Sequence, residues 1–429
     1  MSNNLLFKDK AYIWHPYTSL MSKQENIVVA SANGIYLNTE DDRKIIDAVS
    51  SWWVNIHGHA HPYLTQKLAE QASVLEHVIF AGFTHEPAIR LAERLLEILP
   101  GPQKRIFFSD NGSTAVEVAI KMAIQYTKNI GKEPGKVIAL EGAFHGDTFG
   151  AMAVSERGIF TDHFGKYLFE VDFVPFPDEN KEEEAIKVFE EKIHIGNITS
   201  FIYEPLIQGA SGMRIYSAEV LEKLISIAKK NNVICIADEV MTGFGRTGKL
   251  FASEYINSKP DIICLSKAIT GGVVPFGVTA CNAKIESSFQ DPELDKTFFH
   301  GHSFTGNPLA CALSNASLDL LLTKEYSDRI KFINEAHKAF SEEIKKIKSV
   351  KKVAVLGTII SIEINTPEES GYTSSIRDEL YNFFLTKNIL MRPLGNIIYI
   401  IPPYIIEKNE LNLIFDAIIE MLKKRANQF

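Results

Sequence analysis

Between residues 105 and 267 the chain alternates short apolar, β-branched runs with amphipathic stretches, and this alternation restricts its possible folds strongly. The apolar runs predict strands at residues 105–109, 136–141, 200–205, 233–238 and 261–267. Amphipathic stretches between them predict helices, for example at 113–126 and 218–231. Because apolar strands separated by helices are typical of a parallel sheet covered on both faces, we expect an α/β fold with a mostly parallel sheet.

The length and the C-terminal pattern indicate more than one lobe. The 429 residues are about two to three times a common single-domain length. Two long helices, from about 308 to 322 and from about 328 to 347, precede apolar stretches at 353–364 and 396–405, which we expect to form a separate, mixed sheet. We predict an N-terminal segment over 1–55 that packs with the small domain, a large domain over 56–310 and a small α+β domain over 311–429.

The charge of the chain narrows the classes of partner. A formal net charge of −8 argues against nucleic acid or an anionic membrane as the main partner.

The first residues lack the apolar core of a signal peptide, and no run approaches the roughly 18 apolar residues of a membrane span. The four cysteines form no CxxC pair and lie in apolar or small-residue stretches, so we predict reduced, buried thiols. We expect a cytoplasmic protein that acts on small molecules.

Two predicted strands end at residues whose chemistry belongs together. The run 233–237 leads into Asp238, and the run 261–266 leads into Lys267. Since ligands of parallel α/β sheets bind at the carboxyl ends of the strands, this carboxylate and this amine can face one ligand. Pyridoxal 5'-phosphate needs such a pair, because the amine forms a Schiff base and moves a proton while the carboxylate keeps the ring nitrogen protonated. Either residue alone is equally compatible with a surface salt bridge; together they favour the cofactor.

A phosphate group needs a cradle of hydrogen-bond donors. The stretch FFSDNGSTAVEVAIKMA has a predicted strand, a glycine turn, and then Ser113 and Thr114 at the start of a helix. Backbone N–H groups and the positive end of the helix suit an anion there. Ordinary N-capping produces the same pattern, so this feature supports the pair Asp238 and Lys267 and does not stand alone.

Residues 243–248 (GFGRTG) match the glycine pattern of dinucleotide-binding loops. We reject a dinucleotide site, because Asp238 and Glu239 precede the loop and would repel a pyrophosphate. Pro260 also leaves little room for the helix that such a site requires. The glycines more plausibly shape a tight loop beside the cofactor.

Histidines suggest a metal site that we do not favour. His57, His59 and His61 alternate in HGHAHP, which can bring imidazoles to one face. No acidic residue lies close in sequence to complete a metal site, so we predict loop packing. The same interpretation applies to His300 and His302.

Arginine and tryptophan residues indicate how a substrate is held. Arg392 precedes an apolar run and can grip a carboxylate through two parallel hydrogen bonds, or form an inter-lobe salt bridge. Adjacent Trp52 and Trp53 indicate one core and one surface ring, or the wall of a pocket for an apolar chain.

With these residues in view, the chain resembles the class III aminotransferases of fold type I over essentially its whole length. IADEVMTGFGRTG (236–248) and LSKAITGG (265–272) are similar to the cofactor signature of that class. Further motifs resemble the branch of the class that converts 8-amino-7-oxononanoate to 7,8-diaminononanoate in biotin synthesis: WHPYT (14–18), SSWWVNIHGHAHP (50–62), FHGDTFGAMAVS (144–155) and HGHSFTGNPLACA (300–312).

The resemblance implies a mostly parallel seven-stranded sheet, pyridoxal 5'-phosphate as cofactor and a homodimer with sites at the subunit interface. It implies that Lys267 forms the Schiff base and that Asp238 pairs with the ring nitrogen. For the cofactor, it also implies that Gly112 and Ser113 bind the phosphate, that His302 and Ser303 of the partner subunit reach this phosphate, and that Phe144 lies on the cofactor ring.

For the substrate, the resemblance implies that Tyr17, Trp52 and Trp53 line the slot for the nonanoate chain and that Arg392 meets its carboxylate. It implies that Gly301 and Tyr399 complete the pocket.

Two positions bear on the amino donor. Phe144 stands where the enzymes of this branch that use S-adenosylmethionine have a tyrosine, and the hydroxyl is lost. His302 stands where many have proline, and HGHS is similar to relatives that take the amino group from lysine. The paired tryptophans favour S-adenosylmethionine, which we predict as the donor, with lysine as the alternative. An ω-amino-acid aminotransferase of the same class is a further alternative, since one fold hosts many reactions.

Overall fold

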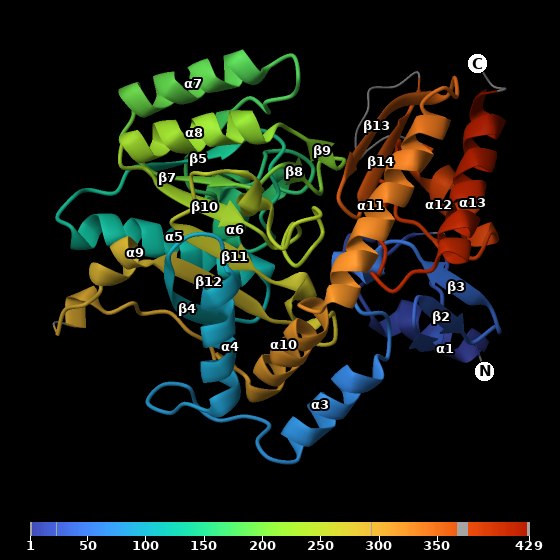
Figure 1. Ribbon diagram of the computed structural model, residues 1–429, viewed down its shortest axis with the longest axis horizontal. Coiled ribbons are helices and arrows are strands. Elements are labelled where there is room, and N and C mark those ends of the chain that lie inside the picture. Colours follow the sequence, from blue (N-terminus) through green and yellow to red (C-terminus); the bar gives the residue numbers. More distant parts are fainter. Residues whose placement is uncertain (1, 23, 293, 367–375, 427–429) are drawn as a thin grey trace.

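The central element of the protein is a seven-stranded sheet, shown in Figure 1 in a computed structural model that describes residues 2–22, 24–292, 294–366 and 376–426. Its order is β4-β12-β11-β10-β7-β5-β6. The strands are β4 (Gln103–Ser109), β5 (Lys136–Leu140), β6 (Val171–Val174), β7 (Ile198–Tyr203), β10 (Ile234–Asp238), β11 (Ile262–Leu265) and β12 (Gly277–Asn282). Only β12 runs antiparallel to its neighbours in this sheet. The mostly parallel α/β fold is therefore confirmed.

Helices cover both faces of this sheet, which explains why its inner strands are apolar throughout. Alternate residues of a strand point to opposite faces. In β10, Cys235 and Ala237 pack in one apolar cluster with α7 (Glu182–Ile195) and α8 (Ala218–Lys230). Ile234 and Ile236 pack in another cluster with α5 (Gly112–Asn129). The predicted strands and helices of this region are present, with ends shifted by a few residues.

Further helices and strands complete this part of the chain. They are α2 (Ser50–Trp53), α3 (Pro62–Ala72), α4 (Glu86–Ile98), α6 (Phe149–Ala153), α9 (Ala283–Ser287), β8 (Ile207–Gln208) and β9 (Arg214–Ile215). Helix α10 (Pro308–Leu321) then leads into α11 (Lys324–Ile344), which crosses toward the C-terminal elements in Figure 1.

The C-terminal part contains a second sheet of order β13-β14-β16, with β13 (Val350–Leu356), β14 (Ile359–Ile364) and β16 (Ile397–Ile400). Both pairings are antiparallel, so the expectation of a mixed sheet here was wrong. The physical reason is Gly357, whose positive φ of 59° allows a tight reversal inside the stretch 353–364. Helices α12 (Ile376–Thr386) and α13 (Lys408–Ala426) complete this part.

The N-terminal strands join the C-terminal part directly. After α1 (Ser2–Tyr12), strands β1 (Val29–Asn33), β2 (Tyr36–Thr39) and β3 (Lys44–Asp47) form a sheet with β15 (Ile389–Leu390). Strands β3 and β15 pair in parallel. Figure 1 shows these strands close to α12 and α13. The domain limits at residues 55 and 310 stay predictions.

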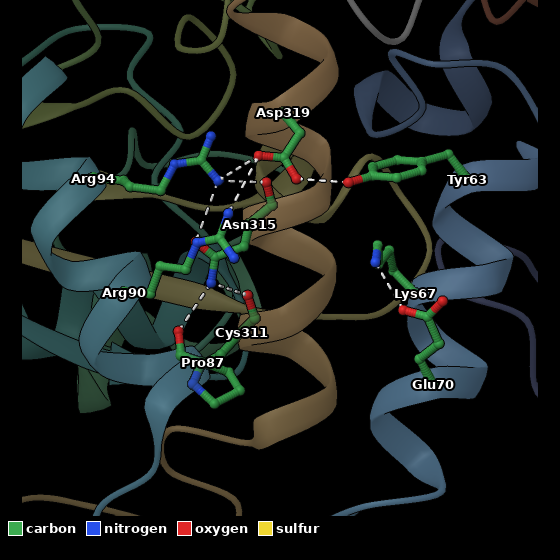
Figure 2. A network of polar contacts seen from close by, with 9 residues as sticks. All are labelled: Tyr63, Lys67, Glu70, Pro87, Arg90, Arg94, Cys311, Asn315 and Asp319. Carbon is green, nitrogen blue, oxygen red and sulfur yellow. Dashed lines mark hydrogen bonds and ion pairs between the residues drawn. The ribbon is translucent and has the colours of Figure 1, made fainter.

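A polar network fixes α10 against α3 and α4 (Figure 2). The carboxylate of Asp319 on α10 accepts the Tyr63 hydroxyl of α3 at 2.8 Å and pairs with Arg94 of α4 at 2.9 Å. Arg94 also donates to the carbonyl of Asn315 at 2.7 Å. Between Asn315 and Asp319 on the same helix, Ser317 donates to the carbonyl of Ala268, next to Lys267, at 3.4 Å. The network thus supports the turn that carries the candidate catalytic lysine.

Within the described ranges, no helix combines the length and the apolar character that crossing a membrane would need.

Candidate active site

Two cavities of about 690 Å³ each meet at Lys267. The inner cavity lies at the carboxyl ends of the parallel strands and is lined by Gly112, Ser113, Phe144, His145 and Asp238 among others. The outer cavity is lined by Tyr17, Trp52, Trp53, Arg392 and Tyr399 among others. Lys267, Trp53 and Phe144 line both. The structure therefore gathers most of the sequence-predicted site residues around one lysine.

Lys267 begins the 3₁₀ turn Lys267–Thr270, directly beyond β11, with a positive φ of 46°. The residue is half-buried at the junction of the cavities, and desolvation lowers the pKa of its amine, while Asp238 and Glu204 act in the opposite direction. The Nζ atom lies 5.0 Å from the centre of the Trp53 ring. A buried amine with a lowered pKa holds more of the neutral form, which is the nucleophilic form.

Asp238 ends β10 and is buried. One carboxylate oxygen accepts the backbone N–H of Val240 at 3.0 Å, and the other lies 2.7 Å from Nδ1 of His145. The His145 ring is itself buried, and its Nε2 has no hydrogen-bond partner within the described residues. This contact orients the Asp238 carboxylate in the inner cavity. Sequence reasoning quoted the motif that contains His145 but assigned the residue no role.

Glu204 is a buried acid that sequence reasoning missed. Its carboxylate accepts the backbone N–H groups of Phe144 at 3.2 Å and Gly209 at 2.9 Å. Burial raises the pKa of Glu204 to about 7, while His145 opposes this effect. The residue fixes the backbone of Phe144 beside the inner cavity. Its signal in the sequence was its position near the end of the predicted strand 200–205, and it directly follows the observed strand β7.

The start of α5 has the geometry of an anion site. Asn111 caps the helix, and Ser113 Oγ accepts the backbone N–H of Thr148 at 2.9 Å. A Cβ added at Gly112 would lie 2.8 Å from a methyl group of Val240, so the glycine is needed for close approach. The free N–H groups and the dipole of a helix start suit a phosphate.

The outer cavity has an aromatic wall with a cation at its end. The Arg392 guanidinium lies 4.2 Å from the centre of the Trp52 ring, and Tyr17 contacts the same ring edge-on at 5.6 Å. Trp53 Nε1 donates to the Tyr399 hydroxyl at 3.1 Å. No carboxylate of the described chain pairs with Arg392, so the alternative of an inter-lobe salt bridge finds no support there.

Asp147 is a further acid that the sequence analysis missed, although it lies in the quoted motif FHGDTFG. It lines both cavities and accepts a hydrogen bond from the Tyr17 hydroxyl. Tyr17 also contacts Phe160, another lining residue of the outer cavity. The acid thus belongs to both cavities and contacts the aromatic wall through Tyr17.

Gly301, His302 and Ser303 lie outside the linings of both cavities of the described chain. Gly301 and Ser303 are exposed. The backbone N–H of His302 donates to the Thr305 hydroxyl at 3.0 Å, and its Nδ1 accepts from the N–H of Phe304 at 3.3 Å. Within one chain these residues do not join the other predicted site residues.

The histidines of HGHAHP have separate partners. His57 lies 2.9 Å from Ser317 Oγ, whereas His59 lies 2.9 Å from the carboxylate of Asp47. His61 contacts the His57 ring, with the ring centres 6.1 Å apart. These different contacts fit the loop-packing interpretation.

The GFGRTG loop makes structural contacts. Its buried Arg246 donates hydrogen bonds to the backbone carbonyls of Trp53 and Pro402, so the loop joins these two segments.

Comparison with known proteins agrees with this geometry. The family model "Aminotransferase class-III" matches residues 18–422. The chain belongs to the class III aminotransferases. It is 43% identical over 419 residues to the adenosylmethionine-8-amino-7-oxononanoate aminotransferase of Synechococcus elongatus, covering 96% of this chain and 98% of the relative.

Two solved structures have the same architecture. The adenosylmethionine-8-amino-7-oxononanoate aminotransferase of Methanocaldococcus jannaschii superposes with a TM-score of 0.93 at 33% identity, covering 99% of both chains. A pyridoxal-phosphate-bound amine transaminase from an uncultivated Pseudomonas species has a TM-score of 0.90 at 27% identity, covering 97% of this chain and 99% of the other. As a class III aminotransferase, the chain is a pyridoxal-phosphate-dependent transaminase.

The inner cavity fits this cofactor on its own features. It combines a buried amine of lowered pKa, a carboxylate at a strand end and a glycine-lined helix start. A Cβ at Gly146 would lie 2.3 Å from Ser113 Oγ, so this wall of the cavity also depends on a glycine. The roles of the individual residues toward the cofactor are proposals.

Proposed function

We propose that this class III aminotransferase converts 8-amino-7-oxononanoate to 7,8-diaminononanoate in biotin synthesis, with S-adenosylmethionine as the amino donor and lysine as the alternative donor. The observation that carries the proposal is the outer cavity, in which an aromatic wall joins Lys267 to Arg392. A substrate with a keto group, an apolar chain and a terminal carboxylate matches that order of groups. The names of the Synechococcus and Methanocaldococcus relatives support the same reaction.

Lys267 is the residue that binds the cofactor and moves the proton in this proposal. Bound pyridoxal phosphate supplies an aldehyde carbon for amine exchange and a ring that accepts electrons. The Nζ of Lys267, neutral more often because of its burial, takes and returns the proton at the reacting carbon. Its place at the junction of the two cavities allows it to reach both ligands.

Asp238 and Phe144 orient the cofactor in this proposal. Asp238, held by His145, faces the ring nitrogen and favours its protonated form. The ring of Phe144, whose backbone is fixed by Glu204, would pack on the cofactor ring. Gly112 and Ser113 bind the phosphate at the start of α5.

Residues of the outer cavity bind the acceptor. Trp52 and Trp53 exclude water along the apolar chain, and the Arg392 guanidinium forms two parallel hydrogen bonds with the carboxylate. Tyr17 and Tyr399 close the slot. The Tyr17 hydroxyl donates a hydrogen bond to Asp147, and the Tyr399 hydroxyl accepts one from Trp53. An ω-amino-acid substrate would have no use for this long aromatic wall.

The donor is tested by a half-reaction. The purified holoenzyme is mixed separately with S-adenosylmethionine and with lysine, and loss of the visible absorbance of the bound pyridoxal form is followed. Bleaching by S-adenosylmethionine alone supports the proposal as stated. Bleaching by lysine alone moves the donor to lysine and points to Phe144 and His302 as the cause. Bleaching by neither, but by another amine, contradicts the proposed pathway.

We further propose a homodimer in which Gly301, His302 and Ser303 of the partner subunit complete each site. These residues do not line the cavities of their own chain, and large apolar side chains beside them and on the N-terminal segment are strongly exposed, including Phe299, Phe304, Trp14 and Met21. Isolated surface apolar residues need no explanation, but a group of them is typical of an interface.

Complementation tests the shared site. Lys267→Ala and Ser303→Asp variants are each expected to be inactive, because one lacks the amine and the other repels the phosphate. Refolding the two together should give mixed dimers that contain one intact site. Restored activity supports the shared site, whereas mixtures as inactive as the separate variants contradict it.

A cytoplasmic location is also proposed. The four cysteines, Cys235, Cys264, Cys281 and Cys311, are buried free thiols, which suits a reducing compartment.

A further inference from the structure

Four consecutive residues of the active-site wall have backbone angles that L-residues rarely adopt. Ser50, Ser51, Trp52 and Trp53 have φ values of 50°, 44°, 73° and 74°. Each lies in the left-handed region, where the side chain approaches the following carbonyl. Such a turn persists only when surrounding groups determine it. The groups that hold this turn therefore determine how both tryptophans face the proposed substrate.

The carboxylate of Asp47 holds the start of the turn. It is fully buried, and one oxygen accepts the backbone N–H groups of Val49 at 3.2 Å and Ser51 at 3.0 Å. The other oxygen accepts the Ser51 hydroxyl at 2.8 Å. At the far end of the turn, Arg246 donates to the carbonyl of Trp53 at 3.1 Å. Both ends of the left-handed segment are therefore anchored by buried charged side chains.

His59 in turn holds Asp47. Its Nε2 lies 2.9 Å from the second Asp47 oxygen, and its Nδ1 lies 3.2 Å from the side-chain amide nitrogen of Asn55. Because that amide nitrogen only donates, Nδ1 accepts and Nε2 carries the hydrogen that Asp47 accepts. The backbone of His59 is fixed as well, through hydrogen bonds in both directions with Gly34. The ring is thus a rigid donor aimed at the anchor of the turn.

We infer that His59 is a positioning residue, which holds Asp47 so that the left-handed turn 50–53 presents Trp52 and Trp53 to the substrate chain. This gives a role to one histidine of HGHAHP. Trp52 carries the Arg392 guanidinium at 4.2 Å, and Trp53 contacts Lys267 and Tyr399. Loss of the His59 donor leaves a buried carboxylate under-satisfied, and the turn relaxes toward ordinary angles. The inference rests on the proposed function, because it assigns the tryptophans to substrate binding.

The test uses nonanoate, which has the chain and the carboxylate of the acceptor but neither its keto nor its amino group. Its binding to the holoenzyme is measured by calorimetry, so the readout does not depend on turnover. The loss of a buried hydrogen bond to a charge predicts binding about tenfold weaker in His59→Ala than in wild type. His59→Gln, which keeps a donor, should recover much of that loss.

His61→Gln is the matched control. His61 belongs to the same motif, but its ring makes no hydrogen bond to the described residues. It should bind nonanoate like wild type. Ser51→Ala, which removes another donor to Asp47 at little risk to folding, should weaken binding in the same direction by a smaller factor.

The two levels of the proposal fail in different ways. Wild-type enzyme that does not bind nonanoate would contradict the assignment of the outer cavity, and with it the proposed function. If the wild-type enzyme binds nonanoate, and His59→Ala and Ser51→Ala bind it with the same affinity as wild type, only the role of His59 would be overturned. In steady state we expect KM for the acceptor to rise in His59→Ala while kcat changes little, and near-ultraviolet circular dichroism to report the altered tryptophans. If His59→Ala instead lowers kcat by a similar factor and leaves KM for the acceptor unchanged, the inference would also be overturned.

Discussion

The imidazole of His145 lies 2.7 Å from the carboxylate of Asp238, and both side chains are buried at the inner end of the active site. The contact joins a strand end to the loop that carries Phe144, so one hydrogen bond aligns the two groups that we propose orient the cofactor. His145→Ala should slow transamination about 10- to 100-fold, the effect of losing a buried hydrogen bond to a charge. His145→Asn, which keeps a donor, should lie between wild type and His145→Ala. The visible spectrum of the cofactor should shift in step with the rate; a slower enzyme with an unshifted spectrum would contradict this role.

Lys267→Ala tests the residue to which we assign cofactor binding and proton transfer. Loss of the proton-transferring amine should reduce the rate by at least about 10²- to 10⁴-fold. The variant should still bind the cofactor through Asp238 and the start of α5, but without the absorbance band of the covalent form. A variant that keeps this band would show that another amine forms the bond.

Glu204 should make stability depend on pH. Burial raises the pKa of Glu204 to about 7 in the folded chain, above the ordinary value of 4.5, so the folded state binds more protons between those values. The contribution to stability is therefore fully present below pH 4.5 and is lost as pH rises through about 7.

Urea unfolding of wild type and Glu204→Gln at several pH values checks this. The difference in unfolding free energy between the two proteins should move in favour of the glutamine variant as pH rises from 5 to 8, because the amide carries no charge to bury. A difference that stays constant with pH would mean that Glu204 does not titrate in this range.

Arg392→Met should weaken carboxylate recognition. Removing two charge-assisted hydrogen bonds should raise KM for the acceptor about 10- to 100-fold. Arg392→Lys keeps the charge but not the planar fork, so it should recover part of the loss. The methyl ester of the acceptor lacks the carboxylate, so its KM should differ little between wild type and Arg392→Met. Equal losses for acid and ester would argue that Arg392 acts through Trp52 packing instead.

Asp319 should matter for stability rather than for chemistry (Figure 2). Asp319→Ala leaves Tyr63 and Arg94 without their shared partner, and should lower the unfolding free energy by about 1–3 kcal/mol. Glu70→Ala, which breaks the exposed pair with Lys67 in the same region, should change it much less, because solvent screens an exposed ion pair. Thermal or urea unfolding compares the two, and similar values would contradict the structural weight given to Asp319.

The strand pattern and the strand-end residues were predictable because they follow from local sequence. Continuous apolar runs indicated the parallel strands, and the positions of Asp238 and Lys267 after two of them indicated a shared ligand. Strand β12 was not anticipated, since it contains glycine and polar residues and pairs antiparallel with both of its neighbours, one of which, β4, is distant in sequence.

Contacts between distant segments were not predictable in this way. Asp147 meets Tyr17, and Glu204 meets the backbone of Phe144, only because the loops cross in three dimensions. The left-handed turn at Trp52 and Trp53 opposes local preference, so no propensity indicates it. Tertiary contacts such as that of Arg246 with Trp53 hold it in place.

The most direct test of the account is a single turnover of the acceptor. The enzyme is first converted to its pyridoxamine form, freed of donor and mixed with 8-amino-7-oxononanoate, while the visible band of the pyridoxal form is followed and products are identified by mass spectrometry. The account predicts that the band returns and that one 7,8-diaminononanoate forms per active site. A pyridoxamine form that 8-amino-7-oxononanoate leaves unchanged, but that a short keto acid or aldehyde such as 4-oxobutanoate restores, would contradict it.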